Sequence, residues 1–182
     1  SIIFTVATQN NTYMEKLLPL VFLLFLHACQ GQGVSDEVNA TKPEAATETI
    51  TPLEMPAYAA QLYDAHQQYL SPSISHRRFK HQDIEPLLLQ LQPPFKREKV
   101  GASIEGRSIY HISWGEGPVP VLLWSQMHGD EPTATMALMD IFNFLAASDE
   151  FDELRKRLAD SLTIHFIPLL NPDGAEKYER RN

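Results

Sequence analysis

The stretch Trp124-Ser-Gln-Met-His-Gly-Asp-Glu-Pro-Thr133 decides the fold, because a strand is expected to end and a helix to begin within it. The residues before it, Val119–Trp124, form a short apolar run of strand length. The residues after it, Thr133–Leu145, repeat apolar side chains at helical spacing. The sequence therefore predicts a strand, a loop that carries His128, and a helix that starts near Glu131.

His128 and Glu131 are the first candidate functional residues. Side chains three residues apart around such a turn project to the same side. Zinc binds imidazole nitrogen and carboxylate oxygen at roughly 2.0–2.2 Å, and a catalytic zinc takes three protein ligands and a water. The same residues also suit an ordinary helix start, in which acidic residues and Pro132 favour the first turn and His128 is a loop histidine. Both interpretations stay open on these residues alone.

Further strands and helices extend outward from this stretch. Hydrophobic patterns bounded by turn residues predict strands at 95–100, 108–114 and 162–169, and helices at 57–70, 82–91 and 150–159. Strands that alternate with helices indicate an α/β domain. Asn171-Pro-Asp-Gly174 predicts a turn after the last strand, since proline presets its backbone angle and glycine permits a positive φ.

Three other residues invite a functional interpretation, but packing is favoured for each. His165 lies inside the last predicted strand, where a hydrogen-bonded histidine in or beside the core is more common than a metal ligand. Trp114 and Trp124 are expected to pack against other side chains rather than to stack on a substrate.

Composition and charge argue against one class of partner. The chain has 182 residues, 43% of them hydrophobic, and a formal net charge of −8. A nucleic-acid surface needs clustered lysine and arginine, whereas the basic clusters at 76–81 and 180–181 are short. We therefore expect no nucleic-acid partner.

The N-terminal part has the pattern of a targeting signal. The apolar run Leu17–Leu26 is too short to span a bilayer but fits the core of a signal peptide. It ends in Leu26-His-Ala-Cys29, which resembles a bacterial lipoprotein signal whose cysteine is lipidated. Because His27 is unusual there, an ordinary cleaved signal is the alternative. Cys29 is the only cysteine, so no intrachain disulfide can form.

These patterns divide the chain into four expected parts. Residues 1–13 would be an upstream extension, 14–29 the signal peptide, 30–56 a flexible tether rich in small and polar residues, and 57–182 the α/β domain. The expected location is the bacterial cell envelope, lipid-anchored with the outer membrane favoured, or else periplasmic or secreted.

Several motifs together resemble the zinc carboxypeptidases of the carboxypeptidase A family. In family order they are Val100–Tyr110, His128-Gly-Asp-Glu131, Asn171-Pro-Asp-Gly174 and Arg180-Arg-Asn182. The resemblance covers roughly residues 95–182 and implies an α/β fold with a mixed, mostly parallel sheet flanked by helices.

The resemblance also implies a role for each matching residue. His128 and Glu131 match the first two zinc ligands of the family. Arg180 matches the arginine that binds the substrate, polarises the scissile carbonyl and steadies the oxyanion, because a fixed cation stabilises developing negative charge; Arg181 is the less favoured choice. The expected cofactor is Zn²⁺, which would activate a water for amide hydrolysis.

Two departures from the family pattern refine this expectation. Pancreatic-type members have a basic residue just before the zinc-binding glutamate, whereas this chain has Asp130, as do bacterial members that trim murein peptides and related deacylases. The family also continues with an Asp-x-Asn-Arg element, a third zinc ligand and a general-base glutamate, which have no counterpart after Arg180. The expectation is the front part of an enzyme, which alone would bind zinc weakly, turn over little and aggregate.

Three functions follow as hypotheses. The leading one is a zinc-dependent carboxypeptidase of the envelope that cleaves peptides, including murein peptides, near their C-terminus. The second is a zinc amidohydrolase that removes an acyl group from an amino acid. The third, which would hold if the natural gene ended at Asn182, is a non-catalytic envelope lipoprotein.

Overall fold

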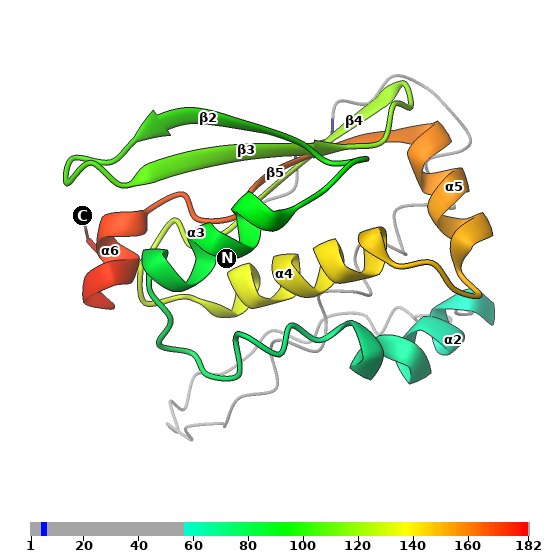
Figure 1. Cartoon of the computed structure of the whole chain (residues 1–182), viewed down its shortest axis with the longest axis horizontal. Helices are drawn as coiled ribbons and strands as arrows, with labels where there is room; N and C mark the ends of the chain where they lie inside the picture. The colour runs from blue at the N-terminus through cyan, green and yellow to red at the C-terminus, as the bar shows by residue number, and fades with distance from the viewer. Residues whose placement is uncertain (1–4, 7–56, 182) are drawn as a thin grey trace, which may run out of the picture.

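A five-stranded mixed sheet runs through the part of the chain that the computed structural model describes, which is residues 5–6 and 57–181. Its strands are β1 Thr5–Val6, β2 Lys96–Ala102, β3 Ser108–Trp114, β4 Val119–Trp124 and β5 Leu162–Ile167. They lie in the order β1-β4-β5-β3-β2 (Figure 1). The strands predicted from β2 to β5 are present, with ends within two residues of the expected bounds.

Parallel pairing is limited to one strand pair among the described strands. β4 and β5 run parallel, with Val119 opposite Leu162 and Trp124 opposite Ile167. The pairs β1·β4, β2·β3 and β3·β5 are antiparallel. The predicted mixed α/β sheet is confirmed, but its described part is not mostly parallel. The reason is local for β2 and β3: a short hairpin loop containing Gly106 at φ 83° joins them, and such a loop can join only antiparallel strands.

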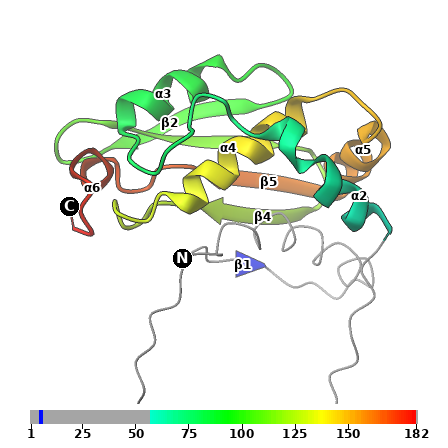
Figure 2. The ribbon, with the colours of Figure 1, turned by 90° about the horizontal axis from the view of Figure 1, so that it is seen from below.

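Helices lie against one face of this sheet. They are α2 Ala57–Ala65, the 3₁₀ helix η2 His66–Tyr69, α3 His81–Gln90, α4 Thr133–Ala146, α5 Asp152–Ser161 and α6 Pro172–Lys177. Figures 1 and 2 show α3, α4 and α6 on the same face, with α5 at one end of the sheet. Three of the helices predicted from periodicity, which correspond to α3, α4 and α5, are present within two residues of their expected ends. The single helix predicted over 57–70 is instead divided into α2 and η2, and α6 was not predicted.

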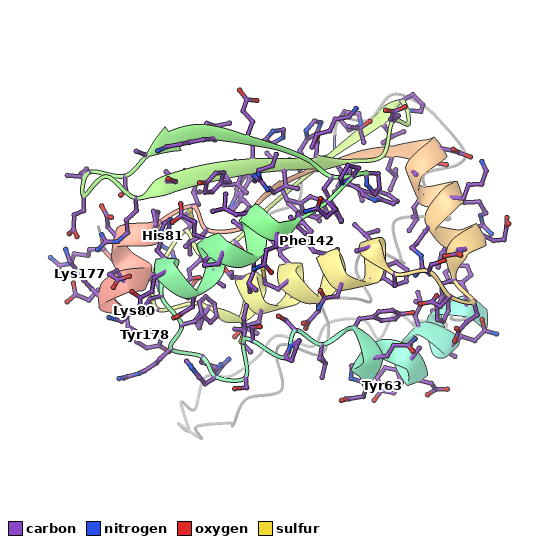
Figure 3. All side chains as sticks on the ribbon, in the orientation of Figure 1. Tyr63, Lys80, His81, Phe142, Lys177 and Tyr178 are labelled. Carbon is purple, nitrogen blue, oxygen red and sulfur yellow. The ribbon has the colours of Figure 1, made fainter. Side chains whose placement is uncertain are left out.

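The core fills the space between α4 and the sheet. On β5 every second residue is buried, and Phe166 is 0% exposed. The ring of Phe142 packs edge-on against those of Phe166 and Phe95, with centroids 4.9 Å and 5.6 Å away. Figure 3 shows Phe142 on the side of α4 that faces the sheet. Burying a side chain of this size stabilises the fold by about 1.5–3 kcal/mol, so this contact fixes α4 on the sheet.

The Asn171–Gly174 segment differs from its prediction as a turn. Asn171 precedes α6 as its N-cap, and its side-chain oxygen accepts a hydrogen bond of 2.9 Å from the Gly174 N–H. Pro172 occupies the first turn, where a missing N–H costs nothing. Gly174 lies inside the helix and does not have a positive φ. Asparagine and proline are as suitable for a helix start as for a turn, and here they form the helix.

The predictions for the N-terminal part fall mostly outside the described residues. Cys29, the signal segment 14–29 and the tether 30–56 are among the residues that are not described. Of the expected upstream extension, Thr5 pairs with Leu122 of β4. In the described part of the chain, no helix is both long and apolar enough to cross a membrane.

Candidate active site

Two loops meet beyond the carboxyl ends of β4 and β5. The parallel pairing continues past both strands, since the Leu170 N–H donates to the Ser125 carbonyl over 3.1 Å and the Asn171 N–H donates to the Gln126 carbonyl over 3.0 Å. The loop from 125 to 132 and the start of α6 therefore lie side by side. In open α/β sheets, ligands bind at the carboxyl ends of parallel strands.

His128 and Glu131 face each other in the first of these loops. His128 Nδ1 lies 3.2 Å from Glu131 Oε2, and the side chains are 26% and 31% exposed. The Glu131 N–H donates to the His128 carbonyl over 3.1 Å, which closes the turn between them. The structure thus brings together the two predicted ligands.

Arg180 joins this pair from the segment after α6. Its Nη1 donates to Glu131 Oε1 over 2.6 Å, while its side chain remains 59% exposed. The Arg180 guanidinium, and after it the contact with His128, lower the pKa of Glu131 to about 2. Glu131 is therefore ionised at neutral pH, as a metal-binding carboxylate must be. Of the two neighbouring arginines, Arg180 is the one whose side chain bonds to Glu131.

The His128 and Glu131 donors fit one edge of a zinc site. Two ligands about 2.1 Å from zinc at a tetrahedral angle lie roughly 3.4 Å apart, which is close to the 3.2 Å between Nδ1 and Oε2. Within residues 57–181 and the two described residues of β1, no group of three or more His, Cys, Asp or Glu side chains could hold a metal. The described residues therefore contain the two side chains predicted as ligands, and no third candidate lies beside them.

Asp173 is a buried carboxylate that the sequence did not single out. It is 3% exposed, and its Oδ1 accepts from Ser103 Oγ over 2.6 Å and from Arg107 Nη1 over 2.7 Å. Its Oδ2 accepts from the Glu105 N–H over 3.0 Å. Burial alone would raise the pKa of Asp173, but the hydrogen bonds from Ser103, Arg107 and Glu105 lower it below its usual value. Asp173 thus fixes α6 to the β2–β3 hairpin.

α6 is also held by the start of α3. Lys80 Nζ pairs with Glu176 over 3.2 Å, and Figure 3 shows Lys80 and His81 near Lys177 and Tyr178. Lys177 in turn pairs with Glu105 of the hairpin loop. Polar contacts therefore connect α6 both to the start of α3 and to the β2–β3 hairpin loop.

The residues for which packing was predicted behave accordingly. His165 Nδ1 lies 2.9 Å from Nε2 of His111, and the two rings are stacked with centroids 5.1 Å apart. Burial, followed by the neighbouring His111, lowers the pKa of His165. Trp114 is 4% exposed within the core, and Trp124 is partly buried. The predicted hydrogen-bonded histidine at position 165 is confirmed.

Comparison with known proteins identifies the family to which this chain belongs. A sequence profile described as zinc carboxypeptidase matches residues 88–182. Mouse (Mus musculus) carboxypeptidase M is 31% identical over 88 residues, which are 44% of this chain and 20% of that protein. Carboxypeptidase D of the duck Anas platyrhynchos is 26% identical over 146 residues, which are 74% of this chain and 10% of that protein. The chain spans a fifth or less of the length of these two relatives.

Similarity to solved structures is lower. A metallo-carboxypeptidase from Burkholderia cenocepacia has a TM-score of 0.49 and 22% identity, over 57% of this chain and 30% of that one. The family assignment rests instead on the profile, which covers more than half of the chain and contains the hairpin loop, the His128 loop and α6. The predicted resemblance is confirmed, and the chain belongs to the zinc carboxypeptidase family.

Proposed function

We propose that the protein is a zinc-dependent carboxypeptidase, in which His128 and Glu131 are two of the zinc ligands and Arg180 binds the substrate carbonyl. The observation that carries this proposal is the convergence of His128 Nδ1, Glu131 Oε2 and the Arg180 guanidinium at the carboxyl ends of the parallel strands. It is supported by membership of the zinc carboxypeptidase family.

Each residue has a separate part in the proposed reaction. Zinc held in part by His128 and Glu131 would supply a Lewis acid that activates a water molecule. His128 offers its Nδ1 nitrogen to the metal, and Glu131 offers a carboxylate oxygen that stays ionised beside Arg180. Since the Arg180 side chain is 59% exposed, it can exchange its contact with Glu131 for one with a substrate oxygen. A cation at this place stabilises negative charge that develops on the scissile carbonyl.

The proposed substrate is a peptide, including the short peptides of murein. Support for murein comes from Asp130, which stands where pancreatic-type members have a basic residue, and from the lipoprotein-like signal that ends at Cys29. A lipid anchor on Cys29 would hold the enzyme at the bacterial envelope, close to murein. The same loop is compatible with removal of an acyl group from an amino acid, so both substrate classes belong in the test.

The decisive experiment measures bound zinc and hydrolysis in the natural gene product that contains these residues. His128→Ala and Glu131→Ala are expected to lose the zinc found by elemental analysis and to lose peptide hydrolysis. Matched controls are His165→Ala, which removes a histidine on β5, and Glu116→Ala, whose side chain is 81% exposed; both are expected to retain zinc. Full zinc content in the His128→Ala and Glu131→Ala variants would refute the ligand assignment.

The substrate and the location need separate measurements. Peptides, murein peptides and N-acyl amino acids are offered in parallel; preference for the last group would replace the carboxypeptidase proposal by the deacylase. A wild-type protein that binds no zinc and cleaves none of them would support a binding lipoprotein. For the anchor, labelled palmitate is expected to enter the wild-type protein in a bacterial host and not the Cys29→Ala variant, and labelling of that variant would exclude Cys29.

A further inference from the structure

Gln126 has an unusual backbone for its residue type. It is the second residue after β4 and has a φ of 50°, in the left-handed region that glycine and asparagine favour. It is also 2% exposed, so a long polar side chain is buried beneath the loop that carries His128. A strained conformation persists only where surrounding contacts impose it. The contacts of Gln126 show what imposes it here.

Gln126 connects three segments around the proposed zinc loop. Its side-chain Nε2 donates to the Gly129 carbonyl over 2.9 Å, inside the turn between His128 and Glu131. Its Oε1 accepts from Thr135 Oγ1 of α4 over 2.9 Å. Its backbone carbonyl accepts from the Asn171 N–H at the start of α6 over 3.0 Å. The amide thus links the middle of the loop to the helix that follows it.

The hydroxyl groups of Ser125 and Thr135 fix the orientation of this amide. Ser125 Oγ bonds to the Pro168 carbonyl and lies 2.9 Å from Thr135 Oγ1. Each hydroxyl has one proton to donate. Thr135 Oγ1 also lies 2.9 Å from the Pro168 carbonyl. Because Ser125 can donate to that carbonyl, Thr135 can donate to Gln126, and with this arrangement both acceptors have a partner. The oxygen of the Gln126 amide then faces Thr135, and its N–H faces Gly129.

We infer that Gln126 is a positioning residue of the proposed zinc site: its amide holds the Gly129 carbonyl so that His128 Nδ1 and Glu131 Oε2 point to one place. This inference rests on the proposed function. The glutamine side chain is long enough to reach the Gly129 carbonyl and has an N–H to donate to it. Glutamate has the same shape but no N–H for the Gly129 carbonyl, and methionine has the length but neither hydrogen bond.

The test measures zinc affinity separately from stability. In the natural gene product, the zinc dissociation constants of Gln126→Glu and Gln126→Met are obtained by competition with a chromophoric chelator, at a temperature well below melting. Loss of a residue that orients a metal ligand weakens metal binding about 10–100-fold, and we expect a change of that size for both variants. Excess zinc is expected to restore kcat, with KM for the peptide unchanged. A residue that only stabilised the fold would lower Tm and leave zinc affinity of the folded protein as it was.

Thr135 supplies a matched pair of controls. Thr135→Ser keeps the hydroxyl that bonds Gln126 and is expected to bind zinc like the wild type. Thr135→Val has nearly the same size and loses the hydroxyl, so it is expected to weaken zinc binding even if the Gln126 variants do not fold. Wild-type zinc affinity in Gln126→Met or in Thr135→Val, together with zinc loss in His128→Ala, would overturn this inference and leave the proposed function intact. If the wild type binds no zinc through His128 and Glu131, the proposed function fails, and the inference fails with it.

Discussion

Gly129 and Gly174 are in direct backbone contact: a Cβ atom added to Gly129 would lie 1.9 Å from the carbonyl carbon of Gly174 and 2.2 Å from its oxygen. Gly129 belongs to the proposed zinc loop, and Gly174 lies in α6. No side chain fits at position 129 unless one backbone moves away from the other. The absence of a side chain thus allows the two chain segments His128-Gly-Asp-Glu131 and Asn171-Pro-Asp-Gly174 to touch.

Gly129→Ala is therefore expected to be strongly destabilising. Overpacking against a fixed backbone costs about 1–3 kcal/mol and sometimes more, and we expect a loss of about 3 kcal/mol in the free energy of unfolding. The measurement is urea denaturation followed by circular dichroism. Gly101→Ala is the control, because a Cβ at that position would have nothing within 4 Å. Equal stability of the two variants would contradict the close contact.

Asp173→Asn is expected to show a pH-dependent loss of stability. Because the folded-state pKa of Asp173 is lowered, its charge stabilises the fold above the unfolded-state pKa of about 3.9, and this contribution disappears as the pH falls through the folded-state pKa. The variant should be about 2 kcal/mol less stable near neutral pH, as expected for a broken buried network, and the difference should shrink below about pH 4. Urea titrations at several pH values measure it.

Asp160→Asn is the control for that experiment. Asp160 pairs with Lys156 on the surface, where its side chain is 63% exposed, and exposed pairs contribute little. A constant difference between wild type and Asp173→Asn across the acidic range would mean that the charge of Asp173 is not what stabilises the hairpin and α6.

Phe166→Ala is expected to cause a large loss in the free energy of unfolding. Phe166 is fully buried and packs on Phe142, and truncation of a buried phenylalanine costs about 3–5 kcal/mol. Ile104→Ala, at a residue that is 91% exposed, should change the free energy of unfolding by less than about 0.5 kcal/mol. Thermal and urea denaturation check both values; a cost below about 1 kcal/mol for Phe166→Ala would contradict the core described above.

In the natural gene product, Arg180→Ala is expected to lower kcat while leaving the stability of the fold unchanged. The side chain is mostly exposed, so Tm should stay near that of the wild type. Removal of a group that stabilises an oxyanion lowers kcat by about 10²–10³-fold, and the same loss is expected here in peptide hydrolysis. Arg181→Ala is the neighbouring control. A larger loss of kcat in Arg181→Ala than in Arg180→Ala would reverse the assignment of the two arginines.

Local sequence patterns were sufficient for most of the fold. β3 and β4 have the bounds expected from their apolar residues and from the turn residues beside them. The His128–Glu131 contact could be predicted as well, because three residues around a turn determine it. The direction of strand pairing was less predictable. β5 pairs antiparallel with β3 and parallel with β4, and its apolar sequence is compatible with both directions.

The supporting residues could not be predicted because distant segments create their roles. Asp173 looked like a turn residue, and only its contacts with Ser103 and Arg107, far away in sequence, make it a buried anchor. Gln126 lies between the end of a strand and a loop, where the sequence has no hydrophobic periodicity. Its inferred role depends on contacts with Thr135 and Gly129 that exist only in the folded chain. A buried polar residue is informative only once its partners are known.

The place of β5 in the sheet also sets an order for folding. β5 lies between β4 and β3 although it follows both along the chain, so the facing edges of β3 and β4 stay unpaired until residues 162–167 insert between them. Until then, the open strand edges can recruit other chains. His128 and Arg180 can meet only after β5 has entered the gap. We therefore expect the insertion of β5 to compete with association between unfolded chains, so the yield of refolded protein should fall as the protein concentration during refolding rises.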